Sequence, residues 1–380
     1  MTCAYVFLVM KDELYALGAM AAAFSLKLTK PKFPVICMIT EDIKTMVPFM
    51  NKIFDKIVTV PYIEAPTNSL KTSKQTNMYL NWKDISFTKW NCLNLVEYEK
   101  VLLVDADKVI LQNLDHLFNL SAPAGTFSSP HSEHYMQRGG IKDPYYNLKH
   151  GNTVSLDQIR IGIFGEYNKS SFTVIGTSIL IAPNKDHYKH FCSMMKQYNN
   201  SKPFGLPCYS MTDEQSIVYF YYEYLPKLTK QPYKWTYISQ KYNWISWRYN
   251  WLRSDEFPPS VIHYFGKKPW LLTRTDWLDL DVWYKFVIKM INDVFSDKDE
   301  NNKEKNDNKE DNKEENKQEN KQENKEQNEK ELISHFYRKS QLEISQSGCF
   351  YCGLIDKDDK SHSFMNDDCK IICPHYLSQL

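Results

Sequence analysis

The chain has 380 residues and a formal net charge of +1 at pH 7, and 42% of its residues are hydrophobic and 14% aromatic. This length and apolar content suffice for one large domain with a sizeable core and an appendage. The near-neutral charge supplies no field that would attract nucleic acid or an anionic membrane, so neither partner is expected. The N-terminus lacks the basic start and long apolar run of a signal peptide, and no stretch approaches the roughly 20 apolar residues of a membrane span. We therefore expect a cytoplasmic protein.

Short apolar runs that alternate with helical patterns predict the organisation of the first 295 residues. The runs that predict strands are residues 4–9, 34–39, 56–60, 100–107, 172–175, 178–183 and 261–265. The segments that predict helices are residues 14–28, 87–97 and 279–295. Alternating strands and helices predict an α/β fold, with a mostly parallel sheet covered by helices on both faces. In such a sheet the ligand crevice lies beyond the carboxyl ends of the strands.

The C-terminal part of the chain differs sharply in composition. Residues 296–331 contain only polar, charged and amide side chains, chiefly Asn, Lys and Glu. Such a segment cannot bury apolar area, so we expect a disordered or solvated spacer rather than a binding arm. The expected domains are therefore a globular domain over 1–295, a linker over 296–331 and a Cys-rich tail over 332–380.

The cysteines indicate a reducing compartment, because an odd and scattered set does not form a disulfide framework. Four of them gather in the tail: Cys349, Cys352, Cys369 and Cys373. Four thiolates at these spacings suit a structural Zn²⁺ site, which would staple a tail too small to fold by itself. The alternative is a hydrophobic docking segment with free thiols.

Asp105-Ala-Asp107 ends the apolar run KVLLVDAD and carries the strongest chemical signal. Alternation along an extended strand would direct both carboxylates to the same side. Two hard anionic oxygens suit Mn²⁺ or Mg²⁺, which can hold a diphosphate and neutralise charge on a leaving group. An isolated Asp-x-Asp is usually a solvated turn. Here apolar residues flank it, so two uncompensated carboxylates would be costly.

Residues 86–118, SFTKWNCLNLVEYEKVLLVDADKVILQNLDHLF, resemble the signature block of glycogenin and the wider glycosyltransferase family 8. Tyr15-Ala-Leu-Gly18-Ala19 is similar to the family's Y-x-x-G-A, and residues 261–270, VIHYFGKKPW, are similar to its VIHF-x-G-x-x-KPW. The resemblance covers about residues 3 to 272, and we expect the nearest relatives among small glycogenin-like proteins of large DNA viruses. It implies a GT-A fold, a UDP-sugar donor, usually Mn²⁺, and transfer with retention of configuration.

The resemblance also implies roles for individual residues. Asp105, Asp107 and His263 resemble the three metal ligands, although a core histidine is the alternative reading of His263. The residues expected to bind the donor are Leu8, Tyr15, Lys89, Asp105, Ala106, Gly266 and Lys268. Of these, Tyr15 resembles the tyrosine beside uracil, Lys89 the lysine facing the donor, and Lys268 the lysine that contacts the diphosphate, with Gly266 allowing the backbone to approach.

Two departures from the family pattern affect the sugar end of the site. Ile175-Gly176-Thr177 replaces the family's N-S-G, which leaves the sugar specificity open. Thr212-Asp213-Glu214-Gln215 replaces its D-Q at a helix start, where acids also suit the positive helix end. The functional interpretation places Gln215 and one acid beside the anomeric carbon. The expected catalytic residues are Lys89, Asp213, Glu214 and Gln215.

The sequence thus predicts a retaining glycosyltransferase that moves a hexose from a UDP-sugar to a hydroxyl acceptor, which could be a protein, the chain itself or a glycan. The alternative is a UDP-sugar-binding scaffold with impaired catalysis. A homodimer is expected by analogy with glycogenin alone.

Overall fold

The computed structural model describes residues 2–69, 76, 79–128, 149–154, 173–174, 178–204, 212–245, 259–264, 268–271 and 280–295. Its centre is an eight-stranded mixed sheet in the order β3-β2-β1-β4-β10-β6-β11-β8. The strands are β1 Cys3–Val9, β2 Val35–Ile39, β3 Lys56–Thr59, β4 Lys100–Leu103, β6 Ala124–Gly125, β8 Thr153–Val154, β10 Ile179–Ile181 and β11 Trp235–Tyr237. The strands β3, β2, β1 and β4 are parallel, whereas β10 is antiparallel to both of its neighbours.

Two smaller sheets accompany the central one. The first joins β12 Trp244–Ile245, β13 Val261–His263 and β5 Lys108–Ile110, and the second pairs β7 Phe127–Ser128 with β9 Thr173–Val174. In the first, β13 runs antiparallel to β5 and places His263 opposite Lys108. This pairing brings a residue from late in the chain next to the Asp-Ala-Asp sequence.

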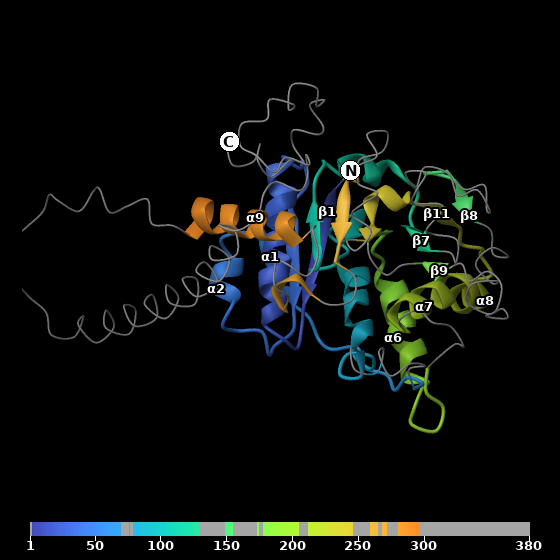
Figure 1. Cartoon of the computed structure of the whole chain (residues 1–380). Coiled ribbons are helices and arrows are strands. Elements are labelled where there is room, and N and C mark those ends of the chain that lie inside the picture. The colour runs from blue at the N-terminus through green and yellow to red at the C-terminus, as the bar shows by residue number, and fades with distance from the viewer. Residues whose placement is uncertain are drawn as a thin grey trace, which may run out of the picture.

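Helices cover both faces of the central sheet. The α-helices are α1 Leu14–Leu28, α2 Val47–Met50, α6 Lys185–Lys196, α7 Thr212–Tyr219, α8 Leu225–Thr229 and α9 Leu280–Met290. The 3₁₀ and π segments are η1 Ser86–Asn94, η2 Asp115–Asn119, η3 Phe220–Tyr224, η4 Gln240–Tyr242, η6 Pro269–Leu271 and η8 Ile291–Phe295. Figure 1 shows α1, α2 and α9 on one side of β1, and α6, α7 and α8 on the other.

Alternate residues of β1 serve two hydrophobic cores. Tyr5 and Phe7 belong to the core that includes α1 and α9, whereas Ala4 and Val6 belong to the core built with η1, α6 and α7. A parallel strand buried on both faces needs a continuous apolar run rather than an alternating one. The sequence CAYVFLV is such a continuous apolar run, so it suits a strand that is buried on both faces of the sheet.

The expected α/β fold with a mostly parallel sheet and helices on both faces is confirmed. Two expected elements are corrected. Residues 87–97 do not form an α-helix, because the segment is the 3₁₀ helix Ser86–Asn94. Hydrogen bonds that span three residues stand at its two ends, from the Thr88 N–H to the Ile85 carbonyl and from the Leu95 N–H to the Cys92 carbonyl.

The expected strand over 100–107 is also too long. β4 ends at Leu103, and the Val104 N–H donates to the Val6 carbonyl before the chain leaves the central sheet. The Asp107 carbonyl then accepts from the Tyr264 N–H, which begins the pairing with β13. The two carboxylates therefore lie where the chain passes from one sheet to another, and strand alternation is not what brings them together.

No helix among the described residues is long and apolar enough to cross a membrane. The expected linker over 296–331 and the tail over 332–380, with its four clustered cysteines, lie outside the described residues.

Candidate metal centre

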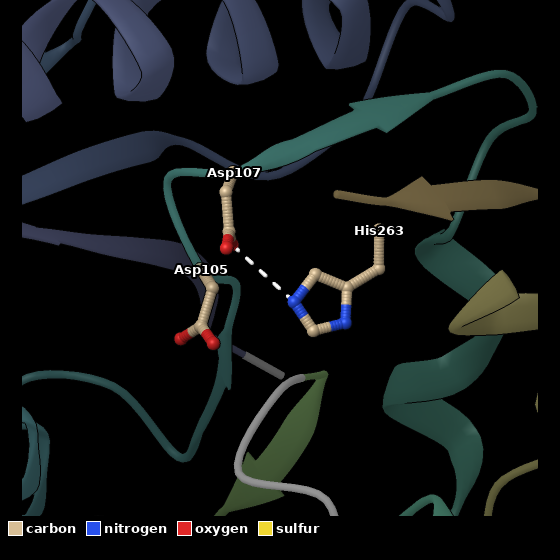
Figure 2. A group of neighbouring side chains, drawn as sticks. All are labelled: Asp105, Asp107 and His263. Carbon is tan, nitrogen blue, oxygen red and sulfur yellow. Dashed lines mark ion pairs between the residues drawn. The ribbon is translucent and has the colours of Figure 1, made fainter. Parts of the chain in front are cut away.

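Two carboxylates and one imidazole converge at the carboxyl end of β4. The donor atoms of Asp105, Asp107 and His263 all lie within 4.8 Å of one another. Figure 2 shows the carboxylate of Asp107 directed at the ring of His263, whose Nε2 lies 3.5 Å from Oδ1 of Asp107, with Asp105 beside them. Oxygen ligands with one imidazole are a donor set that Mn²⁺ accepts. The residues present therefore fit a divalent metal ion.

Burial and charge keep Asp107 and His263 in the protonation states that metal binding requires. Asp107 is 5% exposed and His263 is 3% exposed. Burial alone would raise the pKa of Asp107, but the Lys268 ammonium and the His263 imidazole hold it well below its usual range. Burial lowers the pKa of His263 despite the attraction of Asp107, so its ring is neutral near pH 7. An ionised carboxylate and a neutral imidazole are the ligating forms.

Two lysines engage the carboxylates from different sides. The Lys268 ammonium lies 2.5 Å from Oδ2 of Asp107. The Lys89 ammonium lies 2.7 Å from Oδ2 of Asp213 and 3.4 Å from Oδ1 of Asp105. Burial would lower the pKa of Lys89, yet Asp105 and Asp213 raise it above the ordinary value, so the cation is fixed. Both lysines are therefore positioned to meet further negative charge at the metal centre.

The contact between Lys89 and Asp213 joins η1 and the start of α7 to the metal centre. The Trp90 indole N–H donates to the Asp213 backbone carbonyl, which holds the same two elements together. Asp213 and Gln215 are both buried. Glu214 lies close enough to raise the pKa of Lys89. Of the expected catalytic residues, Lys89 thus links Asp213 to Asp105, and Glu214 and Gln215 follow Asp213 in α7.

Two tryptophan rings pack against Tyr15. Its ring centroid lies 4.8 Å from that of Trp82 and 4.9 Å from that of Trp270. Burial raises the pKa of Tyr15, and the negative charges of Asp107 and Asp12 raise it further, so this phenol stays protonated. The family-like tyrosine therefore lies within electrostatic reach of the metal ligands.

Gly18 is required by the close packing of α1 against this cluster. A Cβ atom at position 18 would lie 2.2 Å from the ring of Trp270 and 2.8 Å from the carbonyl oxygen of Ala106. The Ala106 carbonyl, which lies between the two aspartates in sequence, therefore packs against α1.

The other residues expected to bind the UDP-sugar are Leu8 and Gly266. Leu8 is half-buried in β1 opposite Met38 and packs against the core that contains η1. Gly266 lies outside the described residues, as do Ile175, Gly176 and Thr177. The structure thus groups Tyr15, Lys89 and Lys268 with the candidate metal ligands Asp105, Asp107 and His263.

Sequence reasoning missed three residues near the centre. Trp82 packs on Tyr15, and Tyr79 has its pKa raised by burial and altered by the charges of Lys268 and Asp107. The segment around them has no periodic pattern, so only its aromatic content could have drawn attention. Lys108 follows the predicted strand 100–107 and was assigned no role, yet it is completely buried and the charges of Asp105 and Asp107 act on it. Its position directly after Asp107 was the available signal.

The sequence model of glycosyl transferase family 8 matches residues 6–152, which is fewer than half of the chain's 380 residues. A search among curated proteins finds no match to this chain.

Several solved glycosyltransferase structures are similar to this chain. The apo structure of the bifunctional glycosyltransferase WbbM has 12% identity and a TM-score of 0.43, and the similarity covers 75% of this chain and 49% of WbbM. An active-site mutant of LgtC has 16% identity and a TM-score of 0.45, over 78% of this chain and 98% of LgtC. The glycosyltransferase GlyE of Streptococcus pneumoniae TIGR4 has 15% identity and a TM-score of 0.41, over 75% of this chain and 60% of GlyE.

The chain thus spans about half the length of WbbM and nearly all of LgtC. The match to the glycosyl transferase family 8 model includes Tyr15, Lys89, Asp105 and Asp107, so this part of the chain is similar to glycosyltransferases of that family.

Proposed function

We propose that this protein is a glycosyltransferase that moves a hexose from a UDP-sugar to a hydroxyl acceptor with retention of configuration, and that it depends on a divalent metal, Mn²⁺ or Mg²⁺. The observation that carries the proposal is the convergence of Asp105, Asp107 and His263 within 4.8 Å. Asp105 and Asp107 lie inside the family-matched region, whereas His263 comes from far outside it. Three metal-binding side chains from two separate segments need the whole fold to meet.

A metal ion held there would bind the diphosphate of the donor and stabilise the negative charge that develops on it as the glycosidic bond breaks. Lys268 is placed to exchange its contact with Asp107 for a contact with the diphosphate, because a phosphate oxygen is an equally good partner for an ammonium. Lys89 holds Asp213 and faces Asp105.

In this proposal the start of α7 faces the sugar. Asp213 forms an ion pair with Lys89, and Glu214 and Gln215 follow it in the first turn of the helix. These side chains supply hydrogen-bonding groups for the sugar and negative charge near the anomeric carbon. Tyr15, between Trp82 and Trp270, offers an aromatic surface for the uracil ring.

Donor hydrolysis tests the proposal without knowledge of the acceptor. Purified full-length protein and Mn²⁺ are incubated with UDP-glucose, UDP-galactose, UDP-N-acetylglucosamine or UDP-xylose in separate reactions, and released UDP is quantified. Asp105→Asn with Asp107→Asn is the matched control, since each change keeps the side-chain size and removes the charge. We expect release from one donor, and none in the control.

Release that persists in the control would show that the two aspartates do not hold the required metal. UDP binding without turnover of any donor would support a UDP-sugar-binding scaffold instead. Absence of both UDP binding and turnover would contradict the proposal entirely.

A further inference from the structure

Lys108 is the first residue of β5 and follows Asp107 directly, and the proposed reaction gives it no role. It is the only lysine among the fully buried side chains of the described residues. Its backbone pairs with that of His263 across the strands, and Asp107 precedes it in the chain. Both of these residues are proposed metal ligands.

The hydrogen-bond acceptor of the Lys108 ammonium is a neutral hydroxyl. Nζ donates to Oγ of Ser178 at 2.6 Å, and the Ser178 hydroxyl in turn donates to the backbone carbonyl of Tyr242 at 3.0 Å. A hydroxyl does not neutralise an ammonium. The charges that act on Lys108 are those of Asp105 and Asp107, which attract it, and that of Lys89, which repels it.

A buried ammonium is costly compared with an apolar side chain of the same shape. Methionine would fill the same space and would leave Ser178 bonded to the Tyr242 carbonyl. A lysine at this position therefore weakens the fold unless its charge serves the neighbouring carboxylates. The structural alternative is that the hydrogen bond to Ser178 is what matters, because it ties β5 to the start of β10.

We propose that Lys108 is a positioning residue of the metal centre, a buried positive charge that partly compensates Asp105 and Asp107 and so weakens their hold on a cation. The inference rests on the proposed function, in which these aspartates bind the metal. A centre compensated in this way binds a cation weakly alone and strongly together with a diphosphate. The cation can then leave with the nucleotide product rather than remain in the protein.

The test measures Mn²⁺ affinity by electron paramagnetic resonance at pH 7.0, with full-length protein and without nucleotide. Lys108→Met and Lys108→Leu remove the charge, whereas Ser178→Ala removes the hydroxyl and keeps the lysine, whose pKa burial lowers to about 8 in the wild type. Lys100→Met is the matched control, because Lys100 Nζ also donates inside the protein, to the Phe118 and Leu120 carbonyls, at the opposite end of β4.

We expect both neutral variants at position 108 to bind Mn²⁺ about tenfold or more tightly than the wild type, since they remove a buried positive charge that acts on both aspartates. Ser178→Ala and Lys100→Met should leave the affinity unchanged. The thermal unfolding midpoint, measured in parallel, reports on structural damage and should not fall in Lys108→Met.

Unchanged or weaker Mn²⁺ binding in both neutral variants would overturn the inference. An equal tightening in Ser178→Ala would overturn it too, because the hydrogen bond and not the charge would then set the affinity. Failure of both neutral variants to fold would show that the ammonium serves the fold itself, which also contradicts the inference. Failure of the proposed function is a separate result: wild-type protein would then bind no Mn²⁺ even when UDP is added.

Discussion

Lys268 places its ammonium 2.5 Å from Oδ2 of Asp107, so a lysine engages one oxygen of a carboxylate that is also a proposed metal ligand. Asp107 presents its other oxygen, Oδ1, to His263. A cation and the ammonium thus compete for the same carboxylate, and the competition is relieved when a diphosphate gives the ammonium another partner.

Lys268→Met should therefore change metal and nucleotide binding in opposite directions. Mn²⁺ alone should bind more tightly, because Asp107 loses its competing cation. UDP in the presence of Mn²⁺ should bind about tenfold to a hundredfold more weakly, the cost of one charge-assisted hydrogen bond. Titration calorimetry measures both. Lys56→Met, at the exposed pair with Glu97, is the control and should alter neither. Changes of the same sign for Mn²⁺ and UDP would contradict the competition.

Gly18→Ala should destabilise the protein, although alanine in place of glycine normally favours a helix. The added methyl group would collide with the Trp270 ring at 2.2 Å and with the Ala106 carbonyl oxygen at 2.8 Å. We expect a loss of about 1–3 kcal/mol in the free energy of unfolding, measured by urea denaturation. Trp270→Leu removes the larger clash, so the double variant should lose less than the sum of the two single changes. Stabilisation by Gly18→Ala would show that α1 does not pack as described.

Asp115 should contribute to stability and not to ligand binding, although it belongs to the same signature block as Asp105. Its carboxylate accepts from the Tyr5 hydroxyl at 2.8 Å and from the Lys32 N–H at 3.1 Å. Asp115→Ala leaves the buried Tyr5 hydroxyl without its acceptor, so the free energy of unfolding should fall by about 1–3 kcal/mol. UDP affinity in the presence of Mn²⁺ should stay the same. Weaker UDP binding in a fully folded variant would assign Asp115 to the ligand site instead.

His150 should make stability depend on pH in the acid range. Burial lowers its pKa to about 4, helped by the charges of His116 and Lys241. Its Nδ1 accepts from the Ser239 N–H at 3.2 Å, a bond that the protonated ring cannot make. Because the folded pKa lies below the unfolded value near 6.5, this contribution is complete above pH 6.5 and is lost as the pH falls towards 4.

His150→Gln should therefore flatten the decline in unfolding free energy between pH 6.5 and about 4, and NMR titration of the wild type should give a His150 pKa well below 6.5. An ordinary pKa for His150, with an unchanged stability profile in the variant, would contradict this reading.

The sequence predicts the central strands β1 and β2 well because both are continuous apolar runs that can only be buried. It predicts the meeting of Asp105 and His263 only through the resemblance, since no local pattern encodes contact between residues so far apart in the chain. The local account of the aspartates was wrong, because β4 ends before them and they lie in the passage between two sheets.

The resemblance also could not separate ligands from scaffold within one motif. Asn113 and Asp115 lie close to Asp107 in sequence but bind other parts of the fold. The Asn113 side chain donates to the Thr29 and Lys30 carbonyls after α1, and the Asp115 carboxylate accepts from the Tyr5 hydroxyl. The position of Lys108 directly after Asp107 was a signal, but the sequence does not show that its side chain is buried and bonded to Ser178. Such distinctions depend on long-range pairing, which appears only in the folded structure.

The most direct test of the central claim is a calorimetric titration of full-length protein with UDP, first with Mn²⁺ and then with excess EDTA, for the wild type and for His263→Ala. If Asp105, Asp107 and His263 hold the metal that binds the diphosphate, the wild type binds UDP with Mn²⁺ and loses most of its affinity in EDTA. The variant should then bind weakly in both conditions. UDP affinity that is equal with and without Mn²⁺ in the wild type would contradict the claim.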